Sequence, residues 1–289
     1  MSNDIDSSSV TGEEGGGPLR TFVGLFLVPL LVVFLCVAVF IGFGWIAYDH
    51  QSTEDYLNDL RSGWRPRRAQ AAYELSKILV ADPHALDNNP GAQAELRELF
   101  AQAEKGDMKR YLALVLGYTG DPEAAPLLIE ALADPDSETR IYVLMALGSL
   151  GDSRALEPLV VALTDEDPGI RKTAAHALGE LGQPTAIEPL QPLLQDSAAD
   201  VRWNAALSLS RLGSTAGIPV LFEMVDRRLS AQVPDITPAQ IEDAMVSAIA
   251  ALRAISAVET RPLLEELAAS DPSLKVRQAA LEALDSLEI

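Results

Sequence analysis

A repeat with a period of 31 residues constrains the fold of this chain more than any other feature of its sequence. A pattern that returns every 20 to 50 residues is typical of stacked units that bury their apolar faces only against their neighbours. Glycine, arginine and leucine each keep this spacing, at Gly120, Gly151, Gly182 and Gly213, at Arg140, Arg171 and Arg202, and at Leu147, Leu178 and Leu209.

One unit, residues 151–182, has the composition of two helices joined by a short turn. Pro158 lies in the opening turn of the first helix, where a missing N–H costs nothing. Apolar residues then follow at helical spacing. After an Asp/Pro turn comes an Ala/Leu-rich segment that ends at Gly182, and glycine readily takes the left-handed conformation of a helix C-cap. Because β-branched alternation is absent from the unit, we expect no sheet.

Degenerate copies of the second-helix pattern flank these units at residues 68–75, 109–117 and 277–284. The unit after Gly213 carries an insertion over residues 229–237, after which Thr237, Pro238 and Gln240 restart a helix in capping-box style. We therefore expect an all-α fold, an α-solenoid of about six helical hairpins over residues 64–289.

The recurrence of Pro, Asp, Arg, Ala-Ala, Leu and Gly in register resembles the HEAT-like repeat of the phycobiliprotein-lyase type. The resemblance is most specific in the three central units and extends over residues 64–289. It implies a right-handed α-solenoid of a kind that mostly binds proteins. It implies no single activity, since fold and function separate freely.

Residues 21–48 carry no charged side chain and hold five of the seven phenylalanines. As a helix this run reaches about 42 Å, whereas about 20 apolar residues cross a bilayer. Trp45 and Tyr48 end it with the amphipathic rings that favour headgroup depth. We expect one transmembrane helix over 21–48, with Cys36 as a small apolar residue within it. A cleaved signal peptide and a buried soluble helix are the alternatives.

The segments on either side of this run differ in character. Residues 1–20 are rich in Ser, Gly and acidic residues, and we expect a disordered tail. Residues 49–63 predict a short helical linker with an acidic first turn. The tail offers one arginine, Arg20, and the other side offers four. The positive-inside rule then favours a single-pass protein with its C-terminal domain in the cytoplasm. The four arginines are Arg61, Arg65, Arg67 and Arg68.

Charge and composition narrow the possible chemistry. The chain has 22 basic and 42 acidic residues and a net charge of −20, which argues against nucleic acid as a partner. One cysteine excludes an internal disulfide framework and a Cys-rich zinc site. The three histidines, His50, His84 and His176, have no metal-ligand spacing. No phosphate loop or catalytic triad occurs, so we expect no catalytic residue, no metal and no cofactor.

An aspartate stands six residues before the arginine in several units. The two could form ion pairs within or between neighbouring units, repeated along the array as a structural ladder. Each exposed pair would contribute about 0–1 kcal/mol to stability. A functional anion site is the alternative. The pairs are Asp134 and Arg140, Asp165 and Arg171, Asp196 and Arg202, and Asp271 and Arg277.

Three columns of the second helix, at +2, +5 and +9 from the arginine, vary between units and share one helical face. In HEAT-like arrays the second helices line the concave side. Exposed aromatic and Met side chains are enriched at partner sites, so we expect a semi-apolar binding groove there. The alternative is that the leucines and Met145 are core. The predicted groove residues are Tyr111, Leu114, Tyr118, Tyr142, Met145, His176, Trp203, Asn204 and Leu207.

These observations favour a non-enzymatic, membrane-anchored scaffold or adaptor. The solenoid would hold a protein partner at the bilayer, with a subunit of a larger membrane complex as one such partner. The alternative, from another class, is a lyase-type or chaperone-like auxiliary protein that acts on a protein substrate. A convergent cluster of titratable groups in the groove would favour that alternative, and the sequence indicates none.

Overall fold

The computed structural model describes residues 28–47, 52–62, 64–89, 91–104, 106–233, 236–255 and 260–286. Within these ranges the chain forms helices, turns and bends, and no strand occurs. The all-α prediction is thus confirmed. The chain divides into two units, residues 1–51 and residues 52–289.

The first unit contains helix α2, Val28–Ala47, which has no charged residue. Its described side chains, residues 30–40, are all exposed, Cys36 among them. No helix in the described part of the chain combines the length and the hydropathy that a membrane span requires. The predicted transmembrane helix over 21–48 is therefore not supported. Residues 21–27 and 48, and the predicted tail over 1–20, lie outside the described ranges.

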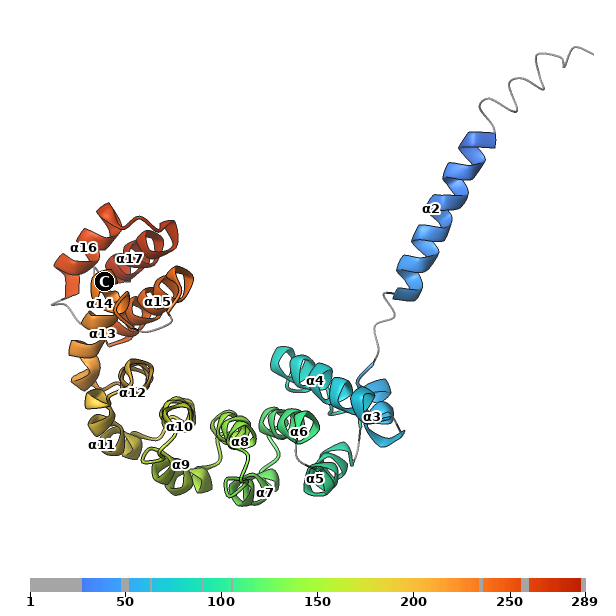
Figure 1. Cartoon of the computed structure of the whole chain (residues 1–289), viewed down its shortest axis with the longest axis horizontal. Coiled ribbons are helices and arrows are strands. Elements are labelled where there is room, and N and C mark those ends of the chain that lie inside the picture. The colour runs from blue at the N-terminus through green and yellow to red at the C-terminus, as the bar shows by residue number, and fades with distance from the viewer. Residues whose placement is uncertain are drawn as a thin grey trace, which may run out of the picture. The chain divides into compact units, whose positions relative to one another are not determined.

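The second unit consists of consecutive helical hairpins (Figure 1). Hydrophobic positions at helical spacing bury one face of each helix against its neighbours. The hairpins pair α3 (Thr53–Ser62) with α4 (Arg65–Ala81), α5 (Ala92–Gln102) with α6 (Asp107–Tyr118), α7 (Ala124–Ala131) with α8 (Ser137–Leu150), α9 (Leu156–Ala162) with α10 (Pro168–Leu181), α11 (Ile187–Leu190) with α12 (Ala199–Arg211), α13 (Ile218–Val225) with α15 (Pro238–Ala254), and α16 (Arg261–Ser270) with α17 (Leu274–Ser286).

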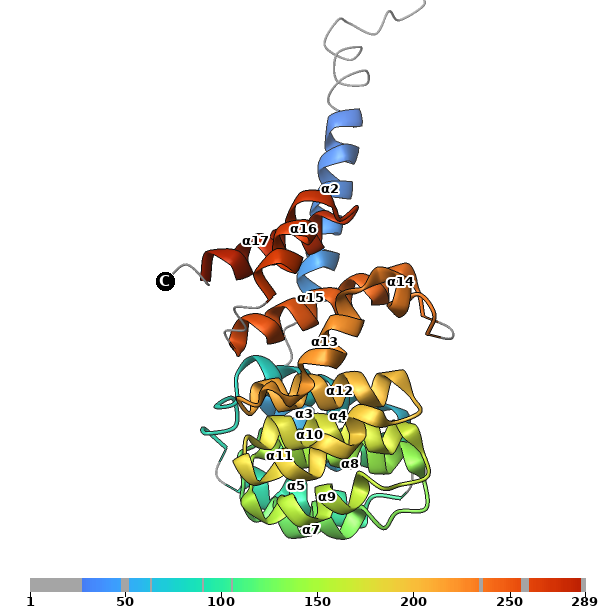
Figure 2. The ribbon, with the colours of Figure 1, turned by 90° about the vertical axis from the view of Figure 1, so that its left-hand side faces the viewer.

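The hairpins stack so that each second helix packs on the second helix of the next hairpin. Figure 1 shows α4, α6, α8, α10 and α12 as the inner row of a curved stack, with α5, α7, α9 and α11 outside it. Figure 2 views the stack from one side, with α12 above α11 and α10 above α9. The face that carries the predicted groove therefore belongs to the inner row.

The ends of the second helices follow directly from their sequences. The carboxylate of Asp167 accepts a hydrogen bond of 2.8 Å from the backbone N–H of Gly169 and so caps α10, whose first residue is Pro168. The helix ends at Gly182, which has a φ of +70°. The predicted left-handed glycines are confirmed, since Gly120, Gly151 and Gly213 also have positive φ.

Two elements differ from the sequence-based expectation. Helix α3 is not a separate linker, because Leu57 and Leu60 are fully buried against α4 and belong to the main core. The array therefore begins at α3, and residues 52–62 are its first helix. Helix α11 ends after one turn and continues as a 3₁₀ helix over residues 191–195. Pro192 explains this change, since a proline inside a helix removes a hydrogen-bond donor and clashes with the preceding turn.

The core divides at the insertion. One cluster of buried residues runs from Leu57 to Leu209, and a second runs from Trp203 to Ala283. Between α13 and α15 lies a short helix, α14 (Arg227–Ser230), which overlaps the start of the insertion. The predicted capping box of Thr237 and Gln240 is confirmed at the start of α15. The regular stacking of second helices thus changes after α12.

Candidate functional site

The candidate site is the inner face of α4, α6 and α8, where three tyrosines form a row. The Tyr73 and Tyr111 ring centroids are 5.2 Å apart at an interplanar angle of 56°. Those of Tyr111 and Tyr142 are 6.0 Å apart in a T-shaped arrangement at 74°. Each tyrosine comes from a different second helix, so the stacking of hairpins, and not local sequence, brings the rings together.

Tyr73 was not among the predicted groove residues. It stands five residues after Arg68, in the same variable column as Leu114 and Met145. The alignment of second helices could therefore have identified Tyr73 as a groove residue. The side chain of Tyr73 is 40% exposed, which makes it the most accessible ring of the row. Tyr111 and Tyr142 are half-buried, and Tyr111 packs against the main core.

The electrostatics of the central tyrosine, Tyr111, favour its neutral phenol. Partial burial, with a smaller effect of Tyr142, raises the pKa of Tyr111 above its ordinary value of 10.0. Lys77 Nζ lies 5.3 Å from the Tyr73 ring centroid and pairs at 2.9 Å with Glu74. The row therefore presents apolar ring surface together with hydroxyl groups that can donate hydrogen bonds.

The remaining predicted residues divide into two groups. Met145 is 38% exposed on the inner face, and Leu114, Tyr118 and Leu207 are half-buried. Tyr118 packs against the first core cluster and Leu207 against the second. The core position of Leu207 agrees with the alternative stated for it. The second group is polar and lies further along the array.

This polar group comes from α10 and α12. Burial lowers the pKa of His176, while nearby Glu180 acts in the opposite direction. Glu180 pairs at 3.0 Å with Arg211 of the next second helix. The side-chain amide of Asn204 donates a 2.8 Å hydrogen bond to the carbonyl of Asp200. The inner face thus changes from aromatic to charged between α8 and α10.

Trp203 does not belong to this face. Only 7% of its surface is exposed, and its ring packs in the second core cluster. Trp203 directly follows Arg202 and stands one position before Asn204, which belongs to the variable face. One residue corresponds to about 100° of rotation around a helix, and that rotation turns Trp203 away from the inner face.

The predicted ladder residues form ion pairs between units and hydrogen bonds within a unit. Arg171 Nε lies 2.8 Å from Asp196 Oδ2 of the next unit, and Arg171 Nη1 donates a 2.8 Å hydrogen bond to the backbone carbonyl of Asp165 in its own unit. The carboxylate of Asp196 in turn accepts the backbone N–H of Ala198 at 2.9 Å. The side-chain pairs therefore join neighbouring units, while the contact within a unit uses the carbonyl.

Other steps of this ladder vary the same arrangement. Lys109 pairs with Asp134 at 2.8 Å, and Arg140 approaches Asp165 at 3.5 Å. Arg202 contacts Glu223 at 2.6 Å in place of an aspartate. Asp271 pairs with Arg227 at 2.8 Å, and the carbonyl of Asp271 accepts a hydrogen bond from Arg277. Each carboxylate is already engaged by the protein, which accounts for the ladder in structural terms.

No group of three or more His, Cys, Asp or Glu side chains that could hold a metal ion occurs in the described parts of the chain.

Comparison with known proteins supports the fold. A sequence profile of HEAT repeats matches residues 93–167 and 157–233. A search of curated proteins finds no match. Among solved structures, the complex of CpcE and CpcF of phycocyanin lyase from Nostoc sp. is 22% identical, with a TM-score of 0.54 over 82% of this chain and 95% of that chain. At this identity the likeness shows the fold alone.

Two further solved structures match with lower TM-scores. An engineered protein is 21% identical with a TM-score of 0.45, and human deoxyhypusine hydroxylase is 20% identical with a TM-score of 0.36. Each match covers 82% of this chain and 96% of the other chain. Residues 93–233 match HEAT repeats, and the helical hairpins on either side of them continue the same kind of stacking.

Proposed function

We propose that this protein is a non-enzymatic scaffold that binds a protein partner on the inner face of its HEAT-like array. The observation that carries the proposal is the row of Tyr73, Tyr111 and Tyr142, with ring-centroid separations of 5.2 and 6.0 Å. Tyrosine offers a large contact area with one polar group and is enriched at the energetic centres of protein interfaces.

The surroundings of the row fit such an interface. Met145 adds a flexible apolar side chain beside the rings, and His176, Glu180 and Arg211 supply polar groups further along the same face. An apolar centre with a polar margin is the usual anatomy of a protein–protein contact. The centre of the proposed interface therefore lies on α4, α6 and α8.

We also propose that residues 21–48 anchor the array to a membrane and that the array faces the cytoplasm. The support is the uncharged run as a whole, of which α2 is one part, together with the arginines that follow it. Confinement to a bilayer would raise the effective concentration of a membrane-bound partner. Retention in the pellet after alkaline carbonate extraction tests the anchor, and protease protection in sealed vesicles tests the orientation.

The binding proposal is tested by replacing Tyr111 and Tyr142 with alanine together. Full-length wild type and variant are cross-linked in cells, purified from solubilised membranes and compared by mass spectrometry. We expect at least one protein recovered with wild type to be lost with the double variant. Val161→Ala, at a side chain 69% exposed on the outer helix α9, is the control and should leave recovery unchanged. Equal recovery with all three proteins, at unchanged helicity, would exclude the tyrosine row as the site.

The alternative, an auxiliary lyase-type or chaperone-like protein acting on a protein substrate, is favoured only by the fold likeness to the phycocyanin lyase complex. The two functions differ in an observable way. A scaffold needs no chromophore, so purified full-length protein should show only aromatic absorbance near 280 nm, whatever candidate cofactors are added. A visible absorbance band that persists through gel filtration would favour the alternative.

A further inference from the structure

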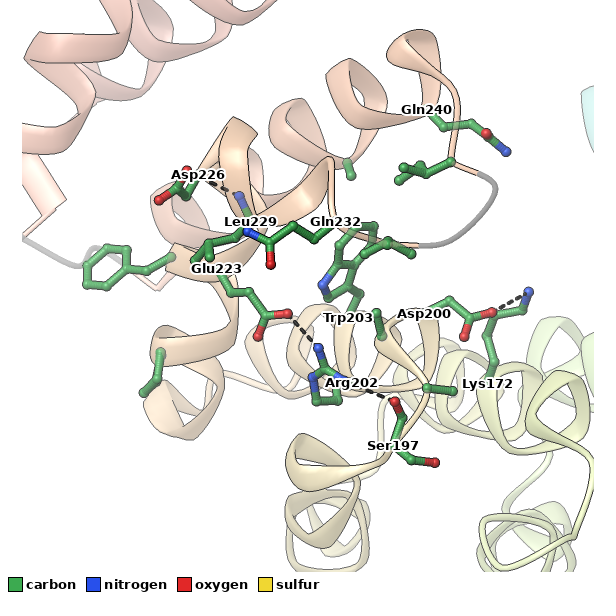
Figure 3. A pocket seen from close by; sticks show the side chains of 17 residues that line it. Lys172, Ser197, Asp200, Arg202, Trp203, Glu223, Asp226, Leu229, Gln232 and Gln240 are labelled. Carbon is green, nitrogen blue, oxygen red and sulfur yellow. Dashed lines mark hydrogen bonds and ion pairs between the residues drawn. The ribbon is translucent and has the colours of Figure 1, made fainter.

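A second site lies at the opposite end of the regular stack, where the insertion interrupts it. A groove of about 1230 Å³ opens between the start of α12, helix α13 and the insertion with α14. Figure 3 shows the side chains that line it. The usual turn between the two helices of a unit has become a longer segment here, and the second core cluster begins at the same place. The groove is therefore a consequence of the insertion.

The groove contains a polar atom that the protein itself does not satisfy. Trp203 is only 7% exposed, and its indole Nε1 is buried without a hydrogen-bond partner. In Figure 3 the indole lies beside Gln232, with the Arg202 and Glu223 side chains just below it in the view. A buried donor without an acceptor is costly, and an acceptor supplied by a ligand removes that cost.

A flexible polar side chain, Gln232, also lines the groove. Gln232 is exposed, and its amide makes a hydrogen bond of 3.3 Å to the carbonyl of Arg228. Gln232 lines the same groove as Trp203 and so adds an exposed amide to its polar surface. Leu229, which is 44% exposed, borders the groove beside it.

The apolar part of the lining indicates what else the ligand must carry. Phe222, Val233 and Ile236 are each only partly buried and pack against the second core cluster from the groove side. An apolar side chain laid against them would be removed from water at about 25 cal/mol per Å². The volume exceeds the roughly 300–1,000 Å³ of most small-molecule pockets, so an elongated ligand fits better than a compact one.

Four of the five charged side chains that line the groove pair with one another. Arg202 pairs with Glu223 at 2.6 Å, and Lys172 pairs with Asp200 at 3.1 Å. Asp226 remains as a third carboxylate, accepting the backbone N–H groups of Arg228 and Leu229 at the start of α14. With a net charge of −20 on the chain, this lining disfavours an acidic ligand and accommodates a neutral or basic one.

We propose that this groove binds an extended peptide segment of a partner protein, neutral or basic in charge, with an apolar side chain against Phe222 and Val233 and a backbone carbonyl that accepts a hydrogen bond from Trp203 Nε1. Peptide carbonyls recur along an extended chain, so one of them can meet the indole wherever the apolar side chain is seated. The site is separate from the tyrosine row and does not depend on it.

The test uses the full-length protein in mild detergent and random decapeptides in three classes, basic, neutral and acidic. An immobilised array selects peptides, and fluorescence anisotropy of labelled copies measures their affinity. We expect saturable binding of basic and neutral peptides that contain an apolar residue. Trp203→Phe removes the donor together with part of the ring and should weaken binding by at least about 3- to 10-fold, the effect of one neutral hydrogen bond. Leu229→Asp, at an exposed position, should weaken the binding of the neutral peptides at least as much.

Two matched substitutions serve as controls. Trp64→Phe changes a tryptophan that is 72% exposed, and Leu274→Asp changes a leucine that is 75% exposed. Neither residue borders the groove, and both variants should bind as wild type does. Absence of saturable binding, a preference for acidic peptides, or wild-type affinity in both Trp203→Phe and Leu229→Asp would overturn the proposal. Leu229→Asp keeps the test decisive should Trp203→Phe fail to fold.

Discussion

Replacing Gly148 with alanine tests whether the inner helices are as close as the structure places them. Gly148 lies in α8 and faces Ala177 of α10. A Cβ at this position would lie 2.8 Å from Ala177 Cα, 3.0 Å from its Cβ and 3.1 Å from its carbonyl oxygen. Ordinary contacts begin at 3.4 Å, and two of these three atoms belong to the backbone. The two helices would therefore have to separate by about half an ångström, against close-packed surroundings.

Two effects of opposite sign decide the outcome. Alanine in place of a helical glycine favours the helix by about 1 kcal/mol. Overpacking costs about 1–3 kcal/mol, and a clash with backbone belongs near the upper end because no side chain can rotate away. We therefore expect Gly148→Ala to lower the free energy of unfolding by about 1–2 kcal/mol. Helix propensity alone predicts a change of similar size in the opposite direction.

Urea denaturation of the full-length protein, followed by circular dichroism at 222 nm, measures this change. Ser149→Ala, at the exposed neighbouring position of the same helix, is the control and should alter the free energy of unfolding by no more than about 0.5 kcal/mol. The reasoning is refuted if Gly148→Ala is as stable as wild type or more stable.

Gly179 allows a related test with a different neighbour. A Cβ there would meet Ser208 Oγ at 2.5 Å and Ser208 Cβ at 2.7 Å, and both atoms belong to a side chain. Gly179→Ala should therefore be rescued in part by Ser208→Gly. A double-mutant cycle should give a favourable coupling energy of about 1 kcal/mol between these contacting sites. Strict additivity would show that the clash is absent.

Three further predictions concern charged groups. Arg171→Ala should lower the free energy of unfolding by about 2 kcal/mol in chemical denaturation, because it leaves the poorly exposed Asp196 without its bidentate partner, and Arg171→Lys should recover only part of the loss. Hydrogen bonds from Thr139, then Arg110, lower the pKa of Asp136 from 3.8 to about 2. Its stabilisation is therefore complete above pH 3.8 and lost toward pH 2, and acid titrations should show that Asp136→Asn flattens this part of the profile. Burial lowers the pKa of His176, so stability should fall as pH drops below 6.5, and an NMR titration should place its ring pKa below that value.

The periodicity of the sequence was sufficient to predict most of the fold. A glycine every 31 residues predicted where second helices end, and Gly120, Gly151, Gly182 and Gly213 all have the left-handed φ that such an end requires. Local chemistry was sufficient at these positions because a helix terminus depends on a few neighbouring residues. The same holds for the capping box at Thr237 and Gln240.

Features that depend on neighbouring helices were less predictable. The contact of Tyr73 with Tyr111 joins residues 38 positions apart and requires the spacing between α4 and α6, which no single unit encodes. Trp203 was assigned to the inner face, yet it lies in the second core cluster because the insertion gives α12 a different neighbour. Leu57 and Leu60 lay outside the visible repeat, so their burial against α4 was missed.

The glycine column and the tyrosine row are two consequences of one spacing. Gly117 lies in α6 against Ala146 of α8, and its missing side chain lets these helices approach until an added Cβ would be 2.6 Å from Ala146 Cα. Those two helices also carry Tyr111 and Tyr142, whose rings meet at 6.0 Å. At the equivalent place in α12 stands Ser210, whose hydroxyl donates a 2.9 Å hydrogen bond to the carbonyl of Ala251 in α15. A hydroxyl occupies space that glycine leaves open, so the close stacking ends where the insertion, the divided core and the Trp203 groove begin. The inner face is continuous only as far as the small residues allow, and the groove uses the place where they stop.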